Sequence, residues 1–166
     1  MKRLAWIMGL TMAGLVSSAV QAAEEVILTD FDGRPQTIQD YAGKGKWLVV
    51  QYWAHDCGIC NQEAPNYARF HDEHAEQDAQ VLGISIDGAG NRAEAEAYIA
   101  RHELTFPNLI GEPVPVMLNF MSLTQESFRG TPTFLLYSPD GTLKAAQAGA
   151  VPVESIKAYI ARNSSS

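Results

Sequence analysis

The hydrophobic positions of this chain follow two patterns that alternate along the sequence. Continuous apolar runs, such as residues 47–53, are typical of strands buried on both faces of a sheet. The stretches between them carry helix-start signals or apolar residues on one helical face. On this basis we expect strands at residues 26–28, 47–53, 81–86, 106–110, 133–138 and 142–148.

One helix is expected before the strand at residues 81–86, and another is expected after it. The first begins near Cys57 and ends near His74, with a kink at the internal proline, Pro65. The second covers about residues 91–102, because an asparagine followed three positions later by a glutamate is a helix-start signal.

Turn signals and a last helix complete the pattern. Asp32-Gly33 and Pro139-Asp140-Gly141 predict tight turns, and residues 39–45 predict a polar connection. Residues 113–123 are ambiguous and in part helical. Pro152 opens a last helix with its apolar residues on one face. Strands that alternate with helices and end in a hairpin and a helix predict a three-layer α/β domain.

The N-terminus has the three parts of a secretory signal. Lys2 and Arg3 precede an apolar stretch, and small residues lead to a cleavage position after Ala22. An uncleaved membrane anchor is the alternative, although the apolar part is short for a span of about 20 residues. We therefore expect a signal at residues 1–22, one domain at residues 23–163 and a flexible tail at residues 164–166.

Cleaved or anchored, such a signal exports the domain from the cytoplasm. In a Gram-negative host the destination is the periplasm, where disulfides persist. The chain has a formal net charge of −7, and the signal contributes only its two positive charges. The acidic balance of the domain argues against nucleic acid and anionic membranes as partners.

Cys57 and Cys60 are the only cysteines in the 166 residues. Their spacing places both on one face of the predicted helix, one turn apart and close enough to bridge. Cys57 also lies at the helix N-terminus, where unpaired N–H groups and the macrodipole favour a thiolate. A bridge between them closes too small a loop to act mainly as a staple. The pair therefore has the geometry of a dithiol that exchanges disulfides.

Five segments resemble, in order, those of the TlpA/ResA-like group of exported thioredoxin-fold thiol–disulfide oxidoreductases. The resemblance covers residues 26–162 and implies a thioredoxin fold, with a central mixed β-sheet flanked by helices, an N-terminal hairpin and a strand–helix insertion. The segments are the hairpin at residues 30–35, the strand at 47–53, CxxC-x-x-E-x-P from Cys57 to Pro65, the insertion at 81–107 and Gly130-Thr131-Pro132-Thr133-Phe134.

The motif from Cys57 to Pro65 carries the expected chemistry. Cys57 is the expected nucleophile, which attacks a partner disulfide as a thiolate. Cys60 is the expected resolving thiol, more buried than Cys57. Glu63 lies one turn beyond Cys60 and is expected to act as general acid and base, with a pKa raised by burial.

Substrate binding is expected beside the two thiols. The resemblance implies a cis peptide bond between Thr131 and Pro132, in a loop that offers backbone groups to the partner chain. Trp53 is expected beneath the motif, where it either borders the docking groove or is simply a core aromatic. The implied partners are cysteine-containing exported proteins and a membrane electron donor, so we expect the reductive direction and no cofactor.

Three residues depart from the group's pattern. Asp56 stands before the first cysteine, where the group usually has Trp, and Ile59 stands where it often has Pro. Gln51 replaces the buried carboxylate of plain thioredoxin. A His55 cation would stabilise the Cys57 thiolate and a carboxylate at Asp56 would oppose it, so the sequence leaves the net effect open.

Other classes of protein remain as alternatives. A copper-binding protein would use His55, Cys57 and Cys60, because soft thiolates suit Cu(I). A thiol peroxidase of peroxiredoxin type would have a Thr three residues before its reactive cysteine, where this chain has Ala54. A non-enzymatic binding domain is the third alternative.

Overall fold

The structure, a computed structural model, describes residues 27–164. The expected signal lies outside the described residues. Within residues 27–164, no helix is long and apolar enough to cross a membrane. The strands are β1 (Leu28–Asp30), β2 (Pro35–Gln36), β3 (Trp47–Trp53), β4 (Ala79–Ser85), β5 (Asn108–Ile110), β6 (Thr133–Tyr137) and β7 (Leu143–Ala148). The α-helices are α1 (Gly58–His74), α2 (Arg92–Arg101), α3 (Pro113–Thr124) and α4 (Val153–Asn163), and the 3-10 helices are η1 (Ile38–Asp40) and η2 (Ala89–Asn91).

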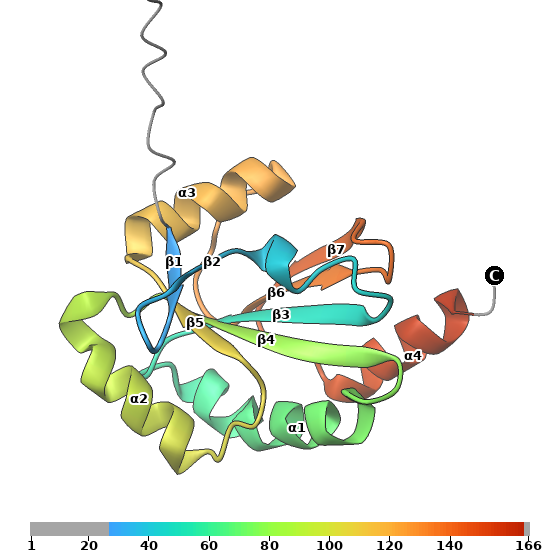
Figure 1. Cartoon of the computed structure of the whole chain (residues 1–166), viewed down its shortest axis with the longest axis horizontal. Helices are drawn as coiled ribbons and strands as arrows, with labels where there is room; N and C mark the ends of the chain where they lie inside the picture. Colours follow the sequence, from blue (N-terminus) through green and yellow to red (C-terminus); the bar gives the residue numbers. More distant parts are fainter. Residues whose placement is uncertain (1–26, 165–166) are drawn as a thin grey trace, which may run out of the picture.

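A mixed sheet of seven strands forms the centre of the molecule (Figure 1). Its order is β2-β1-β5-β4-β3-β6-β7, with β3 parallel to β4 and antiparallel to β6. The pair β1–β2 forms the expected N-terminal hairpin and adds to β5 in antiparallel orientation. The residues expected for the strand–helix insertion, 81–107, contain most of β4 and all of α2, and β5 follows directly. This arrangement confirms the predicted thioredoxin fold.

Strand β3 supplies side chains to both hydrophobic layers, and all seven of its residues are buried. Its even-numbered residues share a core with Val116 and Phe120 of α3. Its odd-numbered apolar residues face the other side, where they pack with α1, α4 and, at Trp53, with Tyr98 of α2. Helix α3 therefore covers one face of the sheet, whereas α1, α2 and α4 cover the other (Figure 1).

The strand boundaries agree with the sequence patterns except at two short strands. The first strand, expected at residues 26–28, extends instead to Asp30, whose carboxylate accepts the N–H groups of Asp32 and Arg34 and closes the hairpin turn. The strand expected at residues 106–110 is formed only by its last three residues. Pro107, which has no N–H to donate, immediately precedes them.

The helices also differ from expectation in detail. The ambiguous residues 113–123 belong to α3, which Pro113 opens. Helix α2 has Asn91 at its N-cap, but the asparagine side chain makes no capping hydrogen bond. The polar connection after residue 38 contains η1, where Asp40 accepts the N–H of Thr37 at 2.7 Å. The conformation of η1 therefore depends on a local hydrogen bond rather than on hydrophobic periodicity.

Gly83 of β4 packs closely against Trp53 at the end of β3 and against Asn108 of β5. A Cβ at Gly83 would lie 2.0 Å from Asn108 Oδ1 and 2.8 Å from Trp53 Nε1, the two atoms of a 3.1 Å hydrogen bond. We expect Gly83→Ala to break this bond and to lower the free energy of unfolding by about 2 kcal/mol, as overpacking does. Urea unfolding measures the change.

The matched control is Gly90→Ala, because a Cβ at Gly90 meets nothing within 4 Å. We expect the control to change the free energy of unfolding by less than about 0.5 kcal/mol. Equal unfolding midpoints for the two variants would contradict the close packing of β4 against Trp53 and Asn108.

Candidate active site

Cys57 and Cys60 lie where β3 gives way to α1. A turn joins the two elements, in which the Cys57 N–H donates to the Ala54 carbonyl at 3.1 Å. Cys57 is the N-cap of α1, and its sulfur accepts the Cys60 N–H at 3.2 Å. The two cysteines form a disulfide with a Cα–Cα distance of 5.2 Å. The N-cap position gives Cys57 the electrostatic environment that favours a thiolate.

The two sulfur positions differ in exposure. Cys60 is fully buried, whereas Cys57 is only partly buried and the next two residues, Gly58 and Ile59, are exposed. A partner disulfide can therefore approach Cys57 but not Cys60. This asymmetry separates an attacking sulfur from a resolving one.

Trp53 supports this motif from below. Its ring stacks on Tyr98 of α2 at a centroid distance of 4.3 Å, and its Nε1 donates to Asn108 Oδ1 at 3.1 Å. The Tyr98 hydroxyl donates to the Cys60 carbonyl at 2.9 Å. With 1% of its surface exposed, Trp53 has no face to offer a partner. Stacking and a satisfied N–H hold Trp53 in the core beneath the motif, which favours a core aromatic over a flank of the docking groove.

Glu63 lies one turn beyond Cys60, on the face of α1 that packs towards the sheet. Its Oε2 is buried and has no hydrogen-bond partner among the described residues. Burial raises the pKa of the Glu63 carboxyl above its ordinary value. Gln51, buried in β3, likewise has an unpaired Nε2, and its amide does not titrate. Glu63 thus offers a carboxyl group of raised pKa one helical turn from Cys60, and its part in proton transfer stays a prediction.

The loop before β6 reaches the same edge of the sheet. β6 pairs with β3 in antiparallel orientation, with Thr133 opposite Tyr52, so the residues before β6 lie beside those that follow β3. The Thr131–Pro132 peptide bond is cis, as the resemblance implies. The Pro132 carbonyl accepts the Gly149 N–H at 2.9 Å, whereas Thr131 makes no hydrogen bond to any other described residue.

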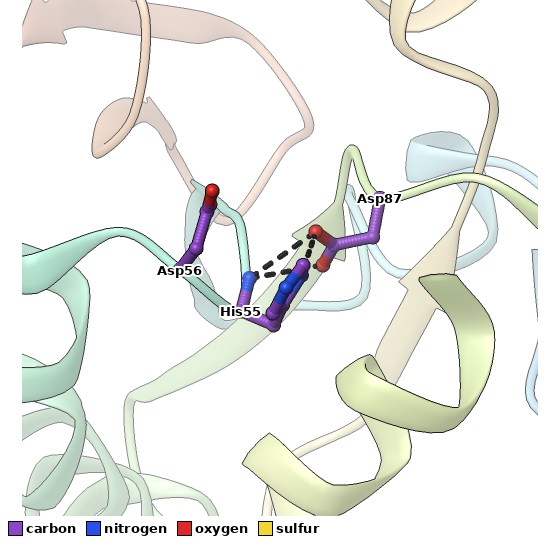
Figure 2. A group of neighbouring side chains, drawn as sticks. All are labelled: His55, Asp56 and Asp87. Atoms are coloured by element: carbon purple, nitrogen blue, oxygen red, sulfur yellow. Dashed lines mark hydrogen bonds and ion pairs between the residues drawn. The ribbon is translucent and has the colours of Figure 1, made fainter. Parts of the chain in front are cut away.

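A buried carboxylate that the sequence reasoning missed holds the turn before Cys57. Figure 2 shows the His55 ring turned towards Asp87, with Nδ1 2.6 Å from Asp87 Oδ1. The His55 backbone N–H also donates to both oxygens of Asp87, at 3.1 and 3.2 Å. Asp87 Oδ2 accepts the Ser85 hydroxyl at 2.6 Å, and the Asp87 side chain is only 4% exposed. A carboxylate accepts hydrogen bonds, so Nδ1 carries the proton.

Asn61 holds the same turn from the other side. Its Nδ2 donates to the carbonyls of His55 and Cys57, at 3.1 and 2.9 Å. Its Oδ1 accepts Arg101 Nη2 and His102 Nε2 from the end of α2, both at 2.9 Å. The inserted helix is thereby linked to the turn that presents Cys57.

The position of Asp87 was open to inference from the sequence. It lies two residues after β4, and carboxyl ends of parallel strands meet at one edge of a sheet. Asn61 and Tyr98 carried no comparable signal. Asn61 meets Arg101 and His102, and Tyr98 meets the Cys60 carbonyl, only because α1 packs against α2.

The copper alternative would use the dithiol form of the two cysteines, whereas this structure has the disulfide. The sulfurs of Cys57 and Cys60 are bonded to each other. Nδ1 of His55 is bound to Asp87. The arrangement therefore favours disulfide exchange.

Two cysteines bonded across the first turn of a helix in a thioredoxin fold define a thiol–disulfide oxidoreductase. The chain belongs to the AhpC/TSA family, whose sequence profile matches residues 19–146. It is 26% identical over 138 residues to thiol-disulfide oxidoreductase ResA of Geobacillus thermodenitrificans, over 83% of this chain and 74% of that protein. A thiol-disulfide isomerase from Corynebacterium glutamicum has a similar fold, with a TM-score of 0.68, 19% identity, and coverage of 87% of this chain and 96% of that one.

A likeness to a peroxidase is confined to one segment. Alkyl hydroperoxide reductase C of Mycobacterium tuberculosis is 40% identical over 52 residues, which are 31% of this chain and 27% of that protein. This chain has buried Ala54 at the place expected for the peroxidatic Thr. The CxxC pair also differs from a lone peroxidatic cysteine, because the resolving sulfur stands on the same helical turn.

The environment of Glu63 predicts a pH-dependent stability. The pKa of Glu63 is raised in the folded state, so the carboxyl ionises more readily in the unfolded chain. The folded state therefore loses stability as the pH rises from the ordinary pKa through the raised one. Glu63→Gln removes this cost. We expect the variant to melt at a higher temperature than the wild type at pH 7. The difference should shrink as the pH falls below about 4, where the carboxyl becomes protonated in both the folded and the unfolded state.

Glu73→Gln is the matched control, because Glu73 lies on the same helix and pairs with Lys157 at the surface, at 3.2 Å. Removing this exposed pair has little effect, so its melting difference should not follow the same pH course. Scanning calorimetry of the oxidised proteins measures both. A Glu63→Gln variant no more stable at pH 7 than the wild type would contradict the burial cost.

Proposed function

We propose that this protein reduces disulfides of exported proteins, with Cys57 as the attacking thiolate and Cys60 as the resolving thiol. The observation that carries the proposal is the unequal exposure of two sulfurs on one helical turn, the more accessible one at the helix N-terminus. Such a pair binds a partner covalently through one sulfur and keeps the second in reserve.

The exchange has two steps that balance in atoms and electrons. The Cys57 thiolate attacks one sulfur of the partner disulfide, and the electron pair of the broken bond leaves on the other partner sulfur, which takes up a proton. The Cys60 thiolate then attacks Cys57 Sγ and releases the second partner thiol. Two electrons and two protons pass to the partner, and the protein retains the Cys57–Cys60 disulfide seen in this structure.

Glu63 supports the second step. A buried thiol such as Cys60 has to lose its proton before it can attack. The unpaired Oε2 of Glu63, one turn away, is a buried acceptor for that proton, and its raised pKa suits it to return the proton later. We assign Glu63 the role of general base towards Cys60 in the reductive direction, and of general acid in the reverse.

Thr131 and Pro132 form the docking edge in this proposal. Thr131 has no hydrogen bond to another described residue, and it precedes the strand that lies beside β3. Its free backbone groups can pair with an extended partner segment, as in β-augmentation. The segment would then lie next to the exposed sulfur of Cys57.

The compartment and the direction rest on the sequence. The charged N-region, apolar stretch and small residues up to Ala22 support export as a cleaved signal, to the periplasm in a Gram-negative host. The resemblance to the TlpA/ResA-like group supports the reductive direction and a membrane electron donor that restores the dithiol. Residues 23–163 then form the exported domain, followed by a short tail.

Trapping tests the proposed nucleophile. Cys60→Ser removes the resolving thiol, so mixed disulfides through Cys57 should accumulate when the variant is expressed in its native compartment. We expect several-fold more adducts than with the wild type on non-reducing gels, released by dithiothreitol and identified by mass spectrometry. The double variant Cys57→Ser with Cys60→Ser should trap nothing, and equal trapping by both variants would sink the assignment of Cys57.

The steady-state redox form tests the direction. Cells quenched with acid and then alkylated preserve the thiol content of the protein. We expect mostly dithiol, because an electron donor restores the reduced pair in a reductase. Mostly disulfide under these conditions would show an oxidase and overturn the reductive direction, while leaving the exchange chemistry intact.

A further inference from the structure

The His55–Asp87 pair stands directly before the attacking sulfur. His55 is the second residue of the turn that Cys57 closes. Its ring is fixed by Asp87, while its side chain is 27% exposed. The pair has the carboxylate–imidazole form that enzymes use to hold a histidine in one orientation beside a nucleophile, but none of the steps above uses it.

The charges around His55 come from three elements. Asp56 lies in the same turn, Asp87 follows β4 and Glu94 belongs to α2. A ring nitrogen of His55 and one oxygen from each of Asp56 and Asp87 lie within 4.8 Å of one another. His55 is therefore a basic group that lies among these carboxylates, two residues before Cys57.

We propose that His55, oriented by Asp87, is a positioning residue that stabilises the thiolate of Cys57 against the neighbouring carboxylate of Asp56. The inference rests on the proposed role of Cys57 as nucleophile. It settles a sign that the sequence left open: the carboxylate of Asp56 opposes the thiolate, and the imidazolium counters it.

The hydrogen bonds around His55 hold its ring in one orientation, unlike a histidine that is free in a loop. Asp87 accepts the backbone N–H and the ring N–H of His55 and the hydroxyl of Ser85 at once. Asn61 fixes the carbonyls of His55 and Cys57 together. The imidazole and the sulfur are thus held by one hydrogen-bonded turn. The hydrogen bond to Asp87 also raises the pKa of His55, which keeps the ring charged further towards neutral pH.

The consequence for the reaction follows from charge alone. Loss of the imidazolium leaves the carboxylates of Asp56 and Asp87 unopposed near Cys57, which raises the thiol pKa. A smaller thiolate fraction slows attack at pH values below that pKa. The reduced form also loses stabilisation, so the reduction potential becomes more negative.

The test uses Cys60→Ser as the parent, because Cys57 is then the only thiol. His55→Asn removes the charge while its amide N–H can still donate to Asp87. The rate of iodoacetamide alkylation against pH gives the Cys57 pKa. We expect His55→Asn to raise that pKa by about one unit, an approximately tenfold lower thiolate fraction at pH values well below it. Thermal melting should change little, because the hydrogen bond to Asp87 is kept.

Two further variants separate charge from structure. His55→Lys keeps a cation without the ring, so the Cys57 pKa should return towards that of the parent. His74→Asn is the matched control, because His74 also pairs with a carboxylate, Asp78 at 2.8 Å, but at the far end of α1. It should leave the Cys57 pKa unchanged.

The outcomes distinguish the inference from the proposed function. A Cys57 pKa that is equal in the parent and in His55→Asn overturns the inference, whatever the reactivity of Cys57. A rise that His74→Asn reproduces also overturns it, since the effect would then follow overall charge. A parent protein in which Cys57 does not react at any pH would instead refute Cys57 as the nucleophile.

Discussion

The hydrogen bonds that fasten residues 54–57 to their surroundings are the constraint on which the site depends. Strand β3 is buried along its whole length and ends at this turn, so the core determines where the chain leaves the sheet. Asp87 then holds the His55 end of the turn and Asn61 holds its carbonyl side. Cys57 is thereby fixed as the N-cap of α1, with its sulfur accepting the Cys60 N–H.

Helix α2 of the expected insertion and strand β5, which follows it, contribute directly to this site. Tyr98 stacks on Trp53 and donates to the Cys60 carbonyl, and Asn108 takes the Trp53 N–H. Arg101 and the following histidine of α2 reach Asn61. The insertion therefore braces the buried sulfur and the turn before the exposed one.

Hydrophobic periodicity was sufficient to predict the elements that lie deep in the fold. The strand at residues 47–53 matches β3, because a continuous apolar run has few alternatives to a buried strand. It failed at short polar elements such as β1 and η1, where a carboxylate that accepts backbone N–H groups determines the conformation. Such bonds depend on side-chain placement, which a pattern of apolar residues does not encode.

The site divides in the same way. The spacing of Cys57 and Cys60 predicted their bridge, because one helical turn fixes the separation of residues three apart. Trp53 lies beneath the motif as expected, but an aromatic residue before the motif serves equally well in a core or at a groove until its neighbours are known. Asp87 was missed because its partner, His55, lies 32 residues away in the sequence. The two residues could have been linked only by pairing β3 with β4 in parallel, which brings the ends of the two strands together.

The central claim is that this pair passes two electrons to a protein disulfide, and a mass measurement tests it most directly. Reduced wild-type protein is mixed with an excess of insulin that has its native disulfides. The mixture is quenched with acid, and the masses of the intact proteins are measured by mass spectrometry. We expect the protein to lose two hydrogens, at Cys57 and Cys60, for each insulin disulfide that gains two. An insulin disulfide that stays intact, while the dithiol form of the protein persists after prolonged mixing, would contradict it.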